Sequence, residues 1–157
     1  PKAYSFTKTE DVQAQCLTGK QKHCVLLLGP KEIKGEFART VKKLMNEFRT
    51  ITFATINTDR YEFSLAKHLP AAPADGSPQI LALQAVAAES KDKTVGKRKA
   101  KTLHLGAKAH RGEFSLTTLR TFLTELQAGK LELAQLKKPP ALRWRKQAKD
   151  DAKVSSK

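Results

Sequence analysis

The chain has few residues of the kinds that do covalent or metal chemistry, and their spacing matches no catalytic motif. Cys16 and Cys24 are too far apart for the Cys-X-X-Cys pair of a redox site. The histidines are His23, His68, His104 and His110. None of these has Cys, Asp or Glu partners at the spacing of metal ligands, and none stands in the sequence context of a Ser or Cys nucleophile. We therefore expect the histidines to be structural or surface residues, with no metal site.

The turn GPKEIKGE, Gly29 to Glu36, follows an apolar run and precedes an amphipathic segment. It lacks the Gly-Lys-Ser/Thr ending with which a phosphate-binding loop supplies a metal ligand. No other stretch suggests a bound group, so we expect no cofactor.

Length and composition indicate one domain with an anionic partner. A chain of 157 residues with 39% hydrophobic content supports one modest core. The formal charge of +15 favours RNA, a ribosome or an acidic lipid surface as partner. No segment approaches the roughly 20 apolar residues of a transmembrane helix, so we expect no membrane insertion. Because the chain begins at Pro1 without an apolar leader, we interpret it as a processed fragment.

Positive charge is concentrated in two segments. Residues 91–101 carry six Lys or Arg against Asp92, which predicts a solvated loop. The chain loses its hydrophobic periodicity beyond Gly129, which predicts a basic tail or partner-binding extension. Trp144 lies between two arginines, and it either docks on a neighbouring molecule or belongs to a solvated tail. The candidate residues for binding RNA or another anion are Lys91, Lys93, Lys97, Arg98, Lys99, Lys101, Arg143 and Arg145.

Hydrophobic periodicity predicts elements in the order helix, strand, helix, strand, helix, strand, strand, helix. The first helix, over residues 6–17, has Thr7 as N-cap and Glu10 at capping-box spacing. The apolar run 24–28 is typical of a strand buried on both faces. The other elements are a helix over 36–48, strands over 51–56, 78–83 and 102–106, a short helix ending near His68, and a helix between Ser115 and Gly129.

This order resembles the thioredoxin fold over about residues 4–135. Three stretches carry the resemblance: CLTGKQKHCVLLLG, GSPQILAL and FSLTTLRTFLTELQAGKLE. They are most similar to the non-catalytic domains of protein disulfide isomerases and of J-domain chaperones fused to thioredoxin modules. The resemblance implies an α/β domain over 1–135, with a central mixed sheet of about four to five strands and helices on both faces. A basic tail over 136–157 would follow.

The resemblance also implies where a redox site would be. Catalytic members carry Cys-X-X-Cys between the first apolar strand and its helix, where the helix dipole lowers the pKa of the nucleophile. Here the turn holds no thiol, and Glu32 and Glu36 would disfavour a thiolate. We therefore expect a redox-inactive module that is not an enzyme.

Two further features follow from the resemblance. Similar isomerase domains can carry a structural disulfide between the elements that hold Cys16 and Cys24; the alternative is two buried free thiols. Ser77 and Pro78 match the position of a cis-proline beside a substrate groove, which with Pro30 would hold an extended polypeptide. Alternatively, Pro78 only shapes the start of a strand.

Three functions are compatible with these features. The first is a chaperone-associated module that binds unfolded polypeptide or a protein partner, in the endoplasmic reticulum lumen if the resemblance holds. The second is a basic subunit of a ribonucleoprotein assembly that contacts the RNA backbone, in the mitochondrion or cytoplasm. The third is a thiol-disulfide oxidoreductase that uses Cys16 and Cys24, which the thiolate argument disfavours.

Overall fold

The computed structural model describes residues 3–17, 23–30, 32–89 and 101–144. Among these residues, six strands form a mixed sheet in the order β1-β3-β2-β5-β6-β7, and β4 and β8 form a separate ribbon. The strands are β1 Tyr4–Ser5, β2 His23–Gly29, β3 Thr52–Asn57, β4 Tyr61–Phe63, β5 Gln79–Glu89, β6 Lys101–Ala109, β7 Ala134–Gln135 and β8 Leu142–Trp144. The helices are α1 Thr9–Cys16, α2 Gly35–Glu47, the 3-10 helix η1 Ser64–His68 and α3 Leu116–Gln127.

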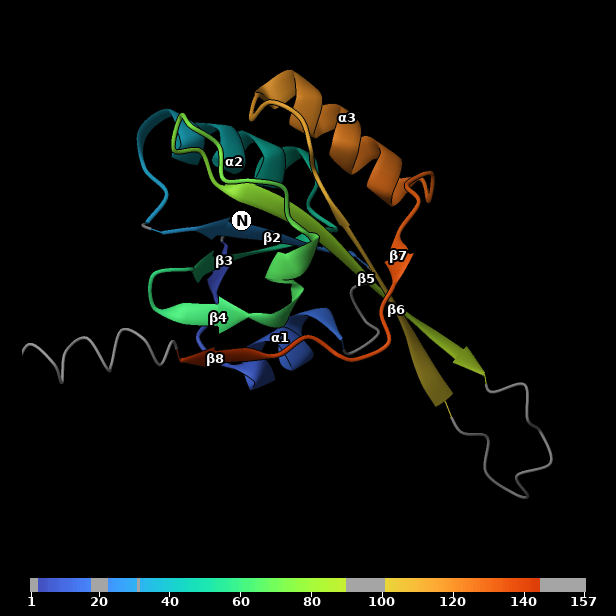
Figure 1. The fold of residues 1–157 in the computed structure, drawn as a ribbon. Helices are drawn as coiled ribbons and strands as arrows, with labels where there is room; N and C mark the ends of the chain where they lie inside the picture. Colours follow the sequence, from blue (N-terminus) through green and yellow to red (C-terminus); the bar gives the residue numbers. More distant parts are fainter. Residues whose placement is uncertain (1–2, 18–22, 31, 90–100, 145–157) are drawn as a thin grey trace, which may run out of the picture.

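The strand directions give a thioredoxin-like fold, which confirms the predicted fold class. β1, β3 and β2 run parallel, whereas β5 runs antiparallel to β2 and β6 antiparallel to β5. Helices α2 and α3 cover one face of the sheet, and α1 lies on the other face with β4 and β8 (Figure 1). The sheet exceeds the predicted strand number through its edge strands β1 and β7, each only two residues long.

The central strand β2 is buried on both faces, as its unbroken apolar run predicts. Val25 and Leu27 point toward α2 and α3, where they join one hydrophobic core. Cys24, Leu26 and Leu28 point the other way and join a second core under α1. Alternation along one strand therefore divides the interior into two layers.

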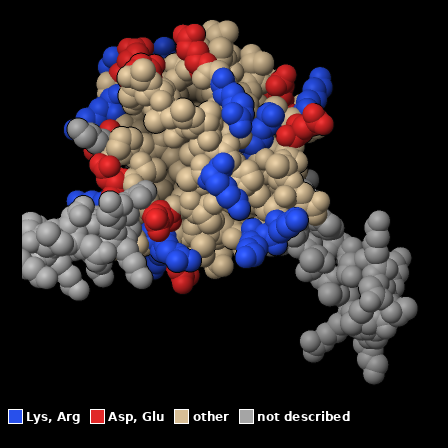
Figure 2. Space-filling view, viewed as in Figure 1, with Lys and Arg blue, Asp and Glu red and all other residues tan. Residues whose placement is uncertain are grey.

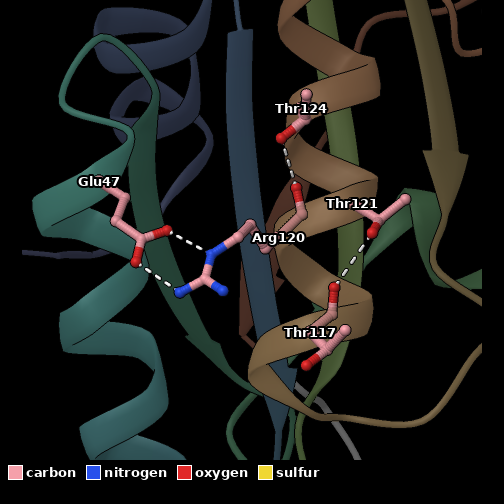
Figure 3. Close-up of polar contacts among 5 residues, drawn as sticks. All are labelled: Glu47, Thr117, Arg120, Thr121 and Thr124. Atoms are coloured by element: carbon pink, nitrogen blue, oxygen red, sulfur yellow. Dashed lines mark hydrogen bonds and ion pairs between the residues drawn. The ribbon is translucent and has the colours of Figure 1, made fainter.

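The two helices on the first face are also joined at their surfaces. Arg120 of α3 donates Nε and Nη2 hydrogen bonds of 2.8 and 2.7 Å to the two carboxylate oxygens of Glu47 on α2 (Figure 3). This hydrogen-bonded ion pair lowers the pKa of the Glu47 carboxyl. Ser115 caps α3 as predicted, because its hydroxyl accepts from the Thr118 amide at 3.2 Å. Gly129, with φ +74°, follows the end of α3.

The segment predicted to begin the tail packs onto the domain instead. Leu142 of β8 is 4% exposed and lies in the same core as the first helix, while Leu136 packs against that core. Trp144 lies opposite Tyr61 of β4, with ring centroids 5.3 Å apart in an edge-to-face arrangement, and remains 43% exposed. Through residue 144, the segment therefore belongs to the folded unit.

The hairpin of β5 and β6 extends past the rest of the sheet (Figure 1). β2 pairs with β5 only as far as Gln84, and β7 pairs with β6 only at Gly106 and Ala107. Beyond these positions the two strands pair only with each other within the described residues, up to Glu89 opposite Lys101. This arm has a continuous backbone ladder but no sheet neighbour to support it.

We predict that Leu142→Ala lowers the free energy of unfolding by about 2–4 kcal/mol, because it leaves a cavity in the core under α1. Arg143→Ala, at the exposed neighbouring position, is the control and should change it by less than about 0.5 kcal/mol. Urea denaturation followed by circular dichroism measures both. Equal, small effects would show that β8 is not part of the folded unit.

Candidate redox site

Cys16 and Cys24 are joined by a disulfide, with their Cα atoms 5.6 Å apart. Cys16 is the last residue of α1, and Cys24 is the second residue of β2. The bond therefore ties a peripheral helix to the central strand of the sheet.

The sheet holds one sulfur in place and the helix holds the other. Cys24 lies between Thr52 of β3 and Leu83 of β5, so hydrogen-bonded neighbours fix its position on both sides. Val12, one turn before Cys16 in α1, is fully buried, and this contact places α1 on the core under the sheet.

Helix α1 has only eight residues and depends on contacts beyond its own hydrogen bonds. The Thr9 hydroxyl donates to the Leu142 carbonyl at 3.0 Å and accepts from the Leu142 amide at 2.9 Å. Thr7 was the predicted N-cap; its amide instead donates to the Asp11 carboxylate at 2.9 Å, which lowers the Asp11 pKa. The helix is thus held at its first residues by these bonds and at its last residue by the disulfide.

Both cysteines are almost completely buried, Cys16 at 2% and Cys24 at 1% exposure. A thiolate that attacks either sulfur must reach it in line with the S–S bond, so the covering structure has to open first. Of the two elements that carry the cysteines, α1 is short, with eight residues, whereas β2 has a hydrogen-bonded strand on each side.

The turn where the family's catalytic pair would stand lies at the opposite end of β2. Gly29 ends the strand five residues after Cys24, roughly 17 Å away at about 3.3 Å per residue. Near the start of α2, Arg39 donates a 2.8 Å hydrogen bond to Glu36 and lowers the pKa of that carboxyl. Glu32 lines a hollow of about 320 Å³ between α2 and the strands β1 and β3. The turn therefore carries the carboxylates of Glu32 and Glu36 at the position where a catalytic thioredoxin-like protein carries its cysteines.

The predicted groove residues are only partly brought together. Ser77 and Pro78 are buried and line a hollow of about 470 Å³ with His110 and Phe114, but Pro30 is exposed and does not line it. The Ser77–Pro78 peptide bond is trans, not cis as the resemblance suggested. The Ser77 hydroxyl donates to Asp75 at 2.7 Å and lowers the pKa of that carboxyl. Ser77 therefore stabilises its own loop.

Most of the predicted anion-binding residues, Lys91, Lys93, Lys97, Arg98, Lys99 and Arg145, lie outside the described residues. Lys101 begins β6, and Arg143 is exposed on β8 opposite Glu62. On the face shown in Figure 2, acidic and basic side chains are interspersed rather than gathered into one basic patch. RNA contact through the basic loop and tail stays a prediction.

The side chain of His110 contacts its surroundings. The His110 ring lies 5.0 Å from that of Phe122, and its Nε2 is 3.1 Å from the Glu113 carbonyl oxygen. Across the described part of the chain, no three His, Cys, Asp or Glu side chains are arranged to hold a metal ion. Within that same part, no helix is long and apolar enough to cross a membrane.

A third hollow, of about 440 Å³, lies next to the disulfide-bearing end of α1. We call it the leucine hollow. It is lined by Gln13, Leu17, Leu105, Leu136, Lys137, Lys138 and Pro139. These residues come from three separate parts of the chain, and sequence patterns did not single them out. The run LKKPP at residues 136–140 could have indicated a surface that is both apolar and basic.

No protein-family model matches the chain, and no curated protein matches it. One similar solved structure is that of chloroplastic thioredoxin z, a protein described as having a type-specific target recognition. The two share 13% sequence identity at a TM-score of 0.45, over 82% of this chain and 97% of thioredoxin z. A likeness of this size carries no conclusion about activity, so function must be inferred from the residues.

The disulfide overturns the expectation of a redox-inactive module that is not an enzyme. That expectation depended on the turn at 29–36, where the family's cysteines would stand. A disulfide and its two thiols differ by two electrons, so the Cys16–Cys24 bond at the other end of the same strand is a candidate redox couple. A chaperone module without redox chemistry is therefore not retained as the function.

We predict that the Cys16→Ser, Cys24→Ser double variant loses about 2–3 kcal/mol of unfolding free energy relative to the oxidised protein, from the short loop that the bond closes. The oxidised protein, unfolded without reductant, should react with no thiol reagent. Mass spectrometry after alkylation that finds both cysteines labelled would contradict the disulfide.

Proposed function

We propose that the protein is a thiol-disulfide redox protein whose redox-active pair is Cys16 and Cys24. The observation that carries this proposal is the disulfide between α1 and β2. Its substrates would be thiols or disulfides of other polypeptides. We also propose that the chain is related to domains of protein disulfide isomerases and of thioredoxin-fused J-domain proteins. The stretches CLTGKQKHCVLLLG, GSPQILAL and FSLTTLRTFLTELQAGKLE support this relationship.

The reaction exchanges one disulfide for another. A substrate thiolate attacks one sulfur of the Cys16–Cys24 bond, which forms a mixed disulfide and releases the other cysteine as a thiolate. A second substrate thiol, once deprotonated, attacks the mixed disulfide and displaces the protein's sulfur. The substrate leaves oxidised, and the protein keeps two electrons and two protons as a dithiol. The reverse sequence reduces a substrate disulfide.

The position of the pair makes exchange slow. A cysteine at a helix N-terminus is activated because the dipole stabilises its thiolate, but Cys16 is at the C-terminus of α1, where the dipole has the opposite sign. Cys24 is surrounded by apolar side chains that do not solvate a charge. Opening of α1 is therefore needed both to admit the substrate and to let water reach the leaving thiolate.

We predict that the protein reduces insulin disulfides with dithiothreitol above background, and that Cys16→Ser abolishes this turnover. The rate should be well below that of a protein with an exposed Cys-X-X-Cys pair, because each cycle waits for α1 to open. The rate of insulin reduction is measured from the turbidity that the precipitating insulin B chain produces.

Thr9→Val is the matched test of the opening step. It removes the hydroxyl that bonds Leu142 but leaves both cysteines in place, so turnover per molecule should rise. Thr124→Val on α3, whose hydroxyl bonds only its own helix (Figure 3), is the control and should leave turnover unchanged. Wild-type turnover indistinguishable from that of Cys16→Ser would refute the proposed function.

A further inference from the structure

The leucine hollow lies next to the end of α1 that carries Cys16. Leu17 directly follows Cys16, and both Leu17 and Leu136 pack against the core that contains the two cysteines. Leu105 is linked to Cys24 through the sheet. Two residues along β6 from Leu105, Ala107 pairs with Leu83 of β5, and Leu83 in turn pairs with Cys24. A chain bound in the hollow would lie beside the end of α1 that has to open.

The far wall of the hollow is held close to the sheet. The Leu136 amide donates a 2.8 Å hydrogen bond to the Leu105 carbonyl. On the opposite face of β6, Gly106 leaves room for Leu133, whose Cβ would lie 2.8 Å from a Cβ at that glycine. The segment that carries Leu136 is therefore held close to β6.

The rim of the hollow is positively charged. Lys137 and Lys138 are both exposed and line it, and neither has an ion pair with another described residue. Two adjacent ammonium groups beside a leucine-lined hollow complement an apolar side chain flanked by carboxylates.

We propose that the leucine hollow is the docking site for the polypeptide substrate, and that the docked segment carries a large apolar side chain between acidic residues. The inference rests on the proposed function in one respect, namely that the docked chain presents its thiol or disulfide to Cys16 and Cys24. The apolar side chain fills the space between Leu17, Leu105 and Leu136. The acidic residues pair with Lys137 and Lys138, which fixes the approach to the end of α1.

The test uses the cysteine-free peptide acetyl-EELFEE-amide, so that binding is measured without exchange. Titration into the oxidised, isotope-labelled protein should shift the backbone amide resonances of Gln13, Leu17, Leu105 and Leu136 in two-dimensional NMR. Lys137→Glu, Lys138→Glu together should weaken binding about tenfold or more, because two attractions become repulsions. The peptide acetyl-KKLFKK-amide should regain affinity for this variant.

Lys42→Glu, Lys43→Glu is the matched control, since these two exposed lysines are also adjacent but lie on α2, across the sheet. It changes net charge equally and should leave the affinity within about twofold. No binding by the wild type, shifts confined to other residues, or equal losses in both variants would each overturn the docking site. Insulin turnover is read separately, so failure of the redox function and failure of the docking site remain distinguishable.

Discussion

The structure depends on the burial of one strand on both of its faces. β2 is apolar from Cys24 to Leu28, and no single layer of helices could remove all of these side chains from water. α2 and α3 therefore pack on one face, and α1 packs on the other with the β4–β8 ribbon. Each Å² of apolar surface removed from water contributes roughly 25 cal/mol, so burial of both faces of β2 favours the folded state.

The second face is the weaker layer, and it carries the sulfur chemistry. α2 and α3 are longer helices joined by the Glu47–Arg120 pair, whereas α1 is short. The bonds of Thr9 and the disulfide compensate for its length. Reduction removes one of these restraints, so electron transfer and the stability of α1 are linked. The candidate redox pair is thereby attached to the shortest α-helix among the described residues.

The regular elements could be predicted because their patterns are unambiguous. The spacing of Phe37, Val41 and Leu44 is helical, and α2 begins and ends within a residue of the prediction. The capping residue Ser115 likewise marks the start of α3. β1, β7 and β8 could not be predicted, because strands of two or three residues contain no period. Their pairing is decided by neighbours distant in sequence, as with Leu142 in a basic, proline-containing segment.

The candidate site was harder to predict than the fold. Cys16 and Cys24 are brought together by the packing of Val12 on the core and by the position of β2 in the sheet, which a separation of eight residues does not encode. The resemblance to thioredoxin-like proteins offered a Cys16–Cys24 disulfide as one of two alternatives, but it placed a redox site at the turn at Gly29, where a thiol would be activated. The leucine hollow was missed for the same reason, since Leu17, Leu105 and Lys137 meet only after the strands have paired.

The central claim is that the Cys16–Cys24 bond exchanges electrons and does not only brace the fold. The most direct measurement is its reduction potential, obtained by equilibrating the folded protein with mixtures of reduced and oxidised dithiothreitol and quantifying the alkylated cysteines. A redox-active pair should give a value between about −120 and −270 mV, the range of thiol-disulfide oxidoreductases. A value below about −300 mV, typical of structural disulfides in secreted proteins, would contradict the account.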